Sequence, residues 1–147
     1  MKIRIAQLRV DEEESVMKRI ERVMDILHSN HEGELLVFPE LWVTGAFSRD
    51  SYSDEAVMYN MQALEKISHI EIKGNAVVGS FIVKLDGNFL RNRLIVRQKN
   101  DELAHYDKIH TFGHQSLESR IVQKGSEIVI KEIAHNLFGF AICYDLR

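Results

Sequence analysis

The chain has 147 residues, of which 45% are hydrophobic and 28% charged, the composition of an ordinary soluble globular domain. A net charge of −3 gives no reason to expect nucleic acid or a membrane as a partner. The single cysteine excludes an internal disulfide and a cysteine-built zinc site, and the seven histidines lack paired metal-ligand spacing. With no signal peptide pattern and no apolar run near the roughly 18 residues of a membrane span, we expect a cytoplasmic protein without a metal.

The first forty residues predict a strand, a helix and a second strand. Residues 2–8 alternate charged and aliphatic side chains, and the acidic stretch 11–14 is expected to form the first turn of a helix that ends within residues 30–33. Residues 34–38 form a short and nearly all-apolar strand. A strand, helix, strand order of this length implies a parallel pair with a crossover. The apolar residues that recur at helical spacing are Val16, Ile20, Val23, Met24 and Leu27.

The middle of the chain predicts a second helix and a hairpin. A helix over residues 53–68 places Val57, Met61 and Leu64 on one face, where the methionine is expected to fill the core. Strands at 76–83 and 89–96 are joined through Asp-Gly-Asn at 86–88, a hairpin signal. A parallel pair together with an antiparallel hairpin predicts a mixed sheet.

The last third predicts a short extended piece at 102–107 and a second hairpin. Residues 111–125 have no clear periodicity and are expected to wrap the mouth of a site. Residues 127–134 are expected to pair with a terminal strand across His135 and Asn136. The continuous apolar segment at 137–142 predicts a strand buried on both faces, which delivers Cys143 to a sheet edge.

Three residues whose side chains could take part in catalysis each follow a predicted strand. Pro39 forces the chain out of the sheet and exposes Glu40 at the strand end, and Lys108 and Cys143 follow later strands. Each residue alone has a plainer interpretation, as a solvated glutamate, a surface lysine or a small buried hydrophobe. A nucleophilic cysteine needs a base and a group that stabilises the oxyanion, which these residues would supply.

In this order and context, the three motifs resemble the nitrilase superfamily of carbon–nitrogen hydrolases over essentially the whole chain. They are Phe-Pro-Glu-Leu-Trp at 38–42, Tyr-Asp-Lys-Ile-His at 106–110 and Ile-Cys-Tyr-Asp-Leu-Arg at 142–147. The resemblance implies that Glu40 is the general base and that Cys143 attacks an amide carbon, releases ammonia and leaves a thioester. Lys108 and the backbone N–H of Tyr144 would stabilise the tetrahedral intermediate. No cofactor is implied.

The same resemblance implies roles for four further residues. Glu118 looks like a second glutamate that many members carry between the lysine and the cysteine, although a solvated loop carboxylate is the alternative. Asn92 looks like a recurring strand asparagine with a structural role. Trp42 and Phe47 are expected to bind substrate, and the pocket wall is expected to differ because this chain has Thr-Gly-Ala at 44–46 where members usually have Thr-Gly-Tyr.

The resemblance also implies an α/β fold: the N-terminal half of a four-layer α-β-β-α sandwich with a mixed sheet. Family members run on well beyond the cysteine, so we expect residues 1–147 to be a carbon-nitrogen hydrolase domain that is incomplete at its C-terminus. Three explanations stay open: a fragment of a longer protein, the product of a disrupted gene, or a half that another chain completes. A homodimer is expected because dimers are usual in similar proteins.

The leading hypothesis is a cysteine-dependent amidase that acts on a small linear carboxamide. The competing hypothesis is a non-catalytic remnant or subunit that acts only by association. A third, a general α/β ligand-binding domain, predicts that Cys143→Ser changes nothing measurable.

Overall fold

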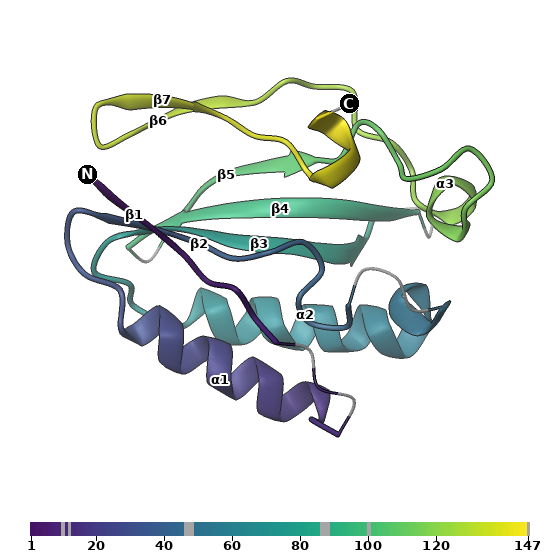
Figure 1. Ribbon diagram of the computed structural model, residues 1–147, viewed down its shortest axis with the longest axis horizontal. Helices are drawn as coiled ribbons and strands as arrows, with labels where there is room; N and C mark the ends of the chain where they lie inside the picture. The colour runs from purple at the N-terminus through teal and green to yellow at the C-terminus, as the bar shows by residue number, and fades with distance from the viewer. Residues whose placement is uncertain (10, 12, 46–48, 86–88, 100, 147) are drawn as a thin grey trace.

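The computed structural model describes residues 1–9, 11, 13–45, 49–85, 89–99 and 101–146 (Figure 1). Phe47 and the turn at 86–88 lie outside the described residues. The described strands are β1 (Lys2–Ile5), β2 (Glu34–Val37), β3 (Asn75–Lys84), β4 (Leu90–Gln98), β5 (Asp101–Asp107), β6 (Ile130–Ile133) and β7 (Asn136–Gly139). The described helices are α1 (Val16–His28), η1 (Arg49–Tyr52), α2 (Asp54–Ser68), α3 (Leu117–Ile121) and η3 (Cys143–Leu146).

Strands β1 to β5 form one mixed sheet in sequence order. β1, β2 and β3 are parallel, whereas β3, β4 and β5 are antiparallel neighbours. Both the parallel β1–β2 pair and the β3–β4 hairpin pairing are therefore confirmed. Strands β2 and β5 run in the same direction, because β2 is parallel to β3 and both β3 and β5 are antiparallel to β4. Their carboxyl ends therefore lie on the same side of the sheet, which allows the residues that follow them to meet.

The sheet lies between two layers (Figure 1). Helices α1 and α2 cover one face, where the apolar side of α1 packs with Leu36, Trp42 and Phe81 in a buried cluster. On the other face, Ile133 and Ile142 of the C-terminal hairpin region pack on Leu35 and other sheet residues. No helix among the described ranges is long and apolar enough to cross a membrane.

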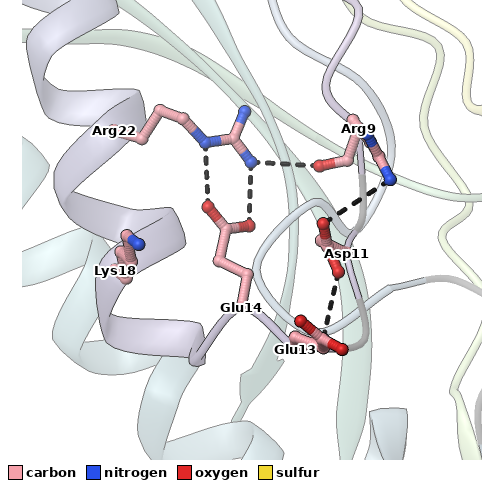
Figure 2. Close-up of a pocket in the computed structure, with 6 residues that line it drawn as sticks. All are labelled: Arg9, Asp11, Glu13, Glu14, Lys18 and Arg22. Atoms are coloured by element: carbon pink, nitrogen blue, oxygen red, sulfur yellow. Dashed lines mark hydrogen bonds and ion pairs between the residues drawn. The ribbon is translucent and has the colours of Figure 1, made fainter.

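The start of α1 differs from the expectation. The helix begins at Val16, one residue after Ser15, whose hydroxyl caps it by accepting a hydrogen bond from the N–H of Lys18 (3.3 Å). The acidic stretch therefore precedes the first turn. Glu14 instead accepts two hydrogen bonds from the Arg22 guanidinium (2.9 and 2.8 Å), as Figure 2 shows. This bidentate pair ties the approaching segment to the second turn of the helix.

The buried face of α2 also differs from the expectation, although the helix itself is confirmed. Met61 is 58% exposed, so its assignment to the core is wrong. Val57 is buried as predicted and Leu64 packs against the core. Ala56, Asn60 and Ala63 are also buried, and the Asn60 side chain accepts a hydrogen bond from the N–H of Ile82 (3.1 Å). This hydrogen bond anchors α2 to β3, and apolar spacing alone did not reveal it.

The terminal apolar segment is not the expected strand buried on both faces. β6 and β7 pair as predicted, but they form a separate two-stranded sheet, and Leu137 is 77% exposed. Because β7 has no neighbour other than β6, its outward side chains face solvent. A short helix, α3, also occupies part of the stretch at 111–125 for which no periodicity was seen.

Candidate active site

Glu40 lies in a tight turn directly after β2. Leu41 adopts a positive φ of 44° and donates its backbone N–H to the Ser80 hydroxyl (3.2 Å). Gly79 lies opposite this turn with a φ of +87°, and a Cβ there would come within 2.5 Å of the Pro39 carbonyl oxygen. Glycine is therefore required at the β3 irregularity, because only glycine lets the turn press against the strand.

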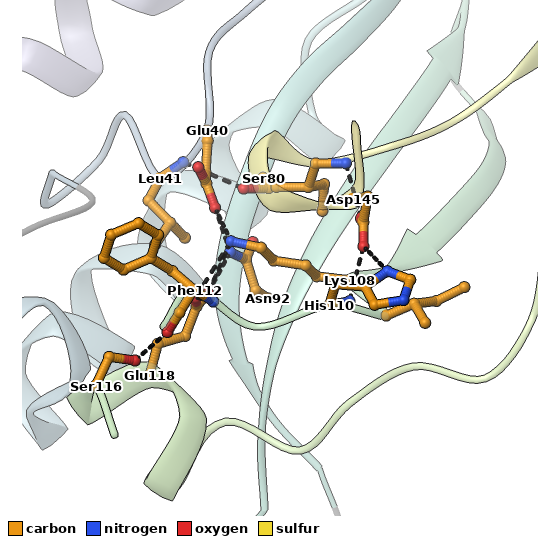
Figure 3. Close-up of polar contacts among 12 residues, drawn as sticks. Glu40, Leu41, Ser80, Asn92, Lys108, His110, Phe112, Ser116, Glu118 and Asp145 are labelled. Atoms are coloured by element: carbon orange, nitrogen blue, oxygen red, sulfur yellow. Dashed lines mark hydrogen bonds and ion pairs between the residues drawn. The ribbon is translucent and has the colours of Figure 1, made fainter. Parts of the chain in front are cut away.

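Lys108 follows β5 and is almost completely buried, with 2% of its surface exposed. Its backbone N–H bonds the Asn92 carbonyl (3.0 Å), and its own carbonyl accepts the N–H of Gly125 (2.8 Å). The ammonium group donates to Glu40 Oε1 at 2.7 Å and to the two Glu118 oxygens at 3.0 and 3.2 Å (Figure 3). One cation thus joins two carboxylates that are 78 residues apart in the chain.

Asn92 and Glu118 complete this arrangement. The Asn92 amide nitrogen donates to Glu40 Oε1 (2.8 Å) and to Glu118 Oε1 (3.2 Å), and Glu118 also accepts the N–H of Phe112 (2.6 Å). Glu118 is only 5% exposed, so the alternative of a solvated loop carboxylate is wrong. We call Glu40, Asn92, Lys108 and Glu118 the carboxylate–lysine cluster.

The cluster keeps Lys108 positively charged. Burial alone would lower the pKa of Lys108, but the hydrogen bonds and charges of Glu40 and Glu118 outweigh burial and raise it above its ordinary value. An ammonium that cannot readily lose its proton is unsuited to general base catalysis. It is suited to stabilise negative charge that develops nearby.

Cys143 begins η3 in a turn formed by residues 142–145, which we call the cysteine turn. Its φ is +46°, a left-handed conformation that side-chain-bearing residues seldom adopt. The residue is exposed as a whole, yet partial burial of the thiol is the largest cause that raises its pKa. The Glu40 charge and a hydrogen bond to Glu40 raise this pKa further, and the Lys108 charge opposes them. The structure therefore brings the thiol to the edge of the carboxylate–lysine cluster.

Trp42, Phe47 and Tyr144 were also expected to belong to the site, and the structure places only some of them there. Trp42 is 2% exposed, donates its indole N–H to the Val78 carbonyl (2.8 Å) and packs edge-on against Phe81, so its expected place in a binding pocket is corrected to one in the core. Phe47 lies outside the described residues. The Tyr144 ring contacts the Phe112 ring edge-to-face at 5.7 Å.

Sequence reasoning did not single out Asp145, whose carboxylate holds the cysteine turn. A signal was present, because aspartate side chains commonly accept backbone N–H groups in turns, and Asp145 stands two residues after the cysteine. In the part of the chain that the structure describes, no three histidine, cysteine, aspartate or glutamate side chains gather in a way that could hold a metal ion.

The fold and the site together define an α/β protein that gathers a thiol, a carboxylate and an ammonium group where two strands of a mixed sheet end. Residues 2–147 match the carbon-nitrogen hydrolase family model, and the chain belongs to this family. The resemblance seen in the sequence is thereby confirmed.

Among curated proteins, the chain is 30% identical to the 2-oxoglutaramate amidase of Paenarthrobacter nicotinovorans over 151 residues. The alignment covers 96% of this chain and 51% of that protein, so the chain spans about half the length of its relative.

Solved structures show the same fold. A mutant of the amidase from Nesterenkonia sp. AN1 in complex with butyramide matches with a TM-score of 0.81 at 17% identity, covering 99% of this chain and 56% of that one. The glutamine-dependent NAD+ synthetase from Acinetobacter baumannii matches with a TM-score of 0.70 at 23% identity, covering 89% and 24%. The expected half of a nitrilase-type fold is confirmed.

Proposed function

We propose that this chain carries the catalytic residues of a cysteine-dependent amidase, which cleaves a small linear carboxamide and releases ammonia. One observation supports this most directly: the Glu40 carboxylate accepts a hydrogen bond from the Lys108 ammonium group (2.7 Å) and is close enough to the Cys143 thiol to raise its pKa. A base, a nucleophile and a fixed positive charge are the three parts that acyl transfer through a thiol requires.

In the first half of the reaction, Glu40 accepts the thiol proton while the Cys143 sulfur attacks the amide carbon. The raised pKa of Cys143 means that the thiol is protonated at neutral pH, so a base in contact with it is needed. The carbonyl oxygen becomes an oxyanion, which the Lys108 ammonium and the backbone N–H of Tyr144 would stabilise.

The tetrahedral adduct then collapses. The C–N bond breaks, protonated Glu40 gives its proton to the leaving nitrogen, and ammonia departs from a thioester on Cys143. In the second half, Glu40 accepts a proton from water, the hydroxide adds to the thioester carbon, and the C–S bond breaks. The thiolate takes the proton back, which leaves a carboxylic acid and the resting thiol. Glu118 and Asn92 would keep Glu40 and Lys108 in place during both steps.

The choice of substrate class rests on the relatives. The curated relative is a 2-oxoglutaramate amidase, and one similar structure holds butyramide. Both names describe unbranched carboxamides, which favours an amide of that shape over a nitrile for this chain.

The alternative, a chain that acts by association without catalysis, is favoured by exposed apolar side chains near the C-terminus. Ile128, Leu137 and Leu146 are 81%, 77% and 81% exposed. Apolar surface of this kind is typical of interfaces. In this proposal, residues 1–147 form an incomplete domain whose apolar surface is covered in a homodimer or by another chain.

Ammonia release by the purified chain tests the two proposals. With 2-oxoglutaramate and butyramide as substrates, we expect release by wild type, loss in Cys143→Ala, and a reduction of at least about 100-fold in Glu40→Gln. Glu127→Gln removes an exposed carboxylate and is the matched control, so it should retain activity. During turnover, intact-mass spectrometry should detect an acyl adduct on wild type and none on Cys143→Ala.

Release that persists in Cys143→Ala would contradict the proposed nucleophile. Wild-type chain that releases no more ammonia than Cys143→Ala would contradict catalysis by this chain. A dimer or larger assembly, seen by size-exclusion chromatography with light scattering, would then support association.

A further inference from the structure

The segment that carries Lys108 and the turn that carries Cys143 meet at one buried carboxylate. We infer that Asp145 is a positioning residue, which fixes the Cys143 turn against the Lys108 segment so that the thiol stays beside Glu40. This inference rests on the proposed role of Cys143 as the nucleophile. It adds a residue whose contribution is geometric and acts through its neighbours.

Each oxygen of the Asp145 carboxylate has its own partners. Oδ2 accepts the Tyr106 hydroxyl (2.7 Å) and the backbone N–H of Ile142 (2.9 Å). Oδ1 accepts the backbone N–H of His110 (2.7 Å), and the His110 Nδ1 lies 3.1 Å from the same oxygen (Figure 3). The Asp145 side chain is 5% exposed, and its bonds to Tyr106 and Ile142 are partly buried, whereas its contacts with His110 lie at the surface.

The hydrogen-bond partners of Asp145 lie in the segment that carries Lys108 and in the turn that carries Cys143. Tyr106 and His110 stand two residues before and two residues after Lys108, whereas Ile142 directly precedes Cys143. Asp145 also closes its own turn by donating its backbone N–H to the Ile142 carbonyl (3.1 Å). A single carboxylate thus joins the chain on both sides of the lysine to the residue before the cysteine.

The cysteine turn needs such a restraint. A positive φ at Cys143 is an unfavourable conformation that persists only where the surroundings hold it. Among the described strands, the adjoining strand β7 is hydrogen-bonded to β6 alone, and it contacts the five-stranded sheet through side-chain packing such as that of Phe138. The buried Ile142 side chain and the Tyr144 ring on Phe112 also pack the turn against this region, and Asp145 adds the directional hydrogen bonds that connect the turn to Tyr106 and His110.

The ionised state of Asp145 is favoured by the same contacts. Burial would raise its pKa, but hydrogen bonds from Ile142, Tyr106 and His110 outweigh burial and lower it. The carboxylate is therefore charged and able to accept all of these bonds at neutral pH.

Asp145→Asn provides a test that hardly changes the size of the side chain. An amide has one oxygen, so either the His110 contacts or the Tyr106 and Ile142 contacts are lost, and an N–H group then faces N–H or O–H donors. With either amide substrate, we expect kcat to fall by about 100-fold while KM changes little, because the nucleophile is displaced and the substrate pocket is not. Tyr106→Phe removes one bond and should give a smaller loss of the same kind.

A second readout follows the thiol directly and needs no activity. Cys143 is the only cysteine, so the rate of alkylation by iodoacetamide against pH reports its titration alone. The charged groups that face the thiol are Glu40 after β2, Lys108 after β5 and Glu118 on α3. Wild type should titrate above the ordinary thiol value of about 8.5. In Asp145→Asn the midpoint should move down toward that value, because the thiol leaves its partly buried place beside Glu40.

Glu102→Gln is the matched control, since Glu102 also pairs with a histidine on β5 (2.9 Å from His105) but lies on the surface. It should change neither readout. Unchanged kcat and an unchanged alkylation midpoint in both Asp145→Asn and Tyr106→Phe would overturn the inference. If circular dichroism shows that Asp145→Asn does not fold, Tyr106→Phe decides by the same two readouts.

The two readouts also separate this inference from the proposed function. A shifted midpoint in Asp145→Asn, with no ammonia release by wild type, would support the positioning role and contradict the activity. Ammonia release by wild type that Asp145→Asn leaves unchanged, with an unshifted midpoint, would support the activity and contradict the positioning role.

Discussion

The carboxylate–lysine cluster and the cysteine turn meet at one site but are built differently. Lys108, Asn92 and Glu118 are buried, and the cluster is held by side chains that bond one another and by the backbone of β4. The cysteine turn follows a two-stranded ribbon with several exposed side chains, and the turn is held by the hydrogen bonds of Asp145 together with the packing of Ile142 and Tyr144. The charged part of the site thus lies at the ends of strands of the five-stranded sheet and on α3, whereas the Cys143 thiol lies in a turn that follows the two-stranded ribbon.

This difference predicts which changes damage the fold and which damage only the chemistry. Changes within the cluster should reduce both stability and activity, because the same bonds serve both. Changes on the outer surface of the ribbon should leave the free energy of unfolding almost unaltered.

Lys108→Met should have the largest effect. It leaves the Glu40 and Glu118 carboxylates close together without their cation, which should lower the free energy of unfolding by about 3–5 kcal/mol. Urea denaturation at neutral pH measures this loss, with the exposed Lys73→Met as the control. A change below about 1 kcal/mol would contradict the central place of the ion pairs.

The difference in free energy of unfolding between wild type and Lys108→Met should depend on pH with a defined sign. The pKa of Lys108 in the folded chain is raised, so its stabilisation is complete below the unfolded value of about 10.4 and is lost as the pH rises through the higher folded value. On the alkaline side, the difference in free energy of unfolding between wild type and Lys108→Met should therefore shrink in strongly alkaline solution.

Gly79→Ala should have an intermediate effect. The new Cβ would lie 2.5 Å from the Pro39 carbonyl oxygen and would sit at a positive φ, so the turn that carries Glu40 has to move. We expect a loss of about 1–3 kcal/mol in the free energy of unfolding, together with reduced activity. Gly139→Ala on β7 is the matched control, because nothing lies within 4 Å of its added Cβ. Equal stability losses in the two variants would contradict the contrast between sheet and ribbon.

Leu137→Ser should have the smallest effect. Leu137 is 77% exposed on β7, so its replacement should change the free energy of unfolding by no more than about 0.5 kcal/mol. Leu36→Ala, at a fully buried position on β2, should cost about 2–5 kcal/mol and serves as the comparison. A large loss in Leu137→Ser, measured on dilute monomeric chain, would show that the ribbon is more tightly integrated than its exposure indicates.

Much of the fold was predictable because its signals are local. The parallel β1–β2 pair, the β3–β4 hairpin and the helix α1 each follow from periodicity and turn residues within a short window. The position of Glu40 and Lys108 at strand ends was predictable for the same reason, since Pro39 and the change to polar residues mark where the strands stop.

The corrections arise where distant segments decide the outcome. Met61 is 58% exposed although its spacing fits an apolar face, and the inward face of α2 instead includes Asn60, which accepts the N–H of Ile82. Similarly, Trp42 stands two residues after Glu40 in the sequence but turns into the core, where the Val78 carbonyl accepts its indole N–H. Neither partner can be identified from the residues beside it in the chain.

The sequence by itself determined the order of the elements, the mixed sheet and the family resemblance. It also identified three candidate site residues. These features depend on residue type and short spacing. Only the tertiary structure decided that Lys108 lies between two carboxylates, that Glu118 is buried, and that the cysteine turn follows a separate two-stranded ribbon. Those features depend on contacts between residues far apart in the chain, where burial, charge pairing and the number of hydrogen-bond partners are set by packing.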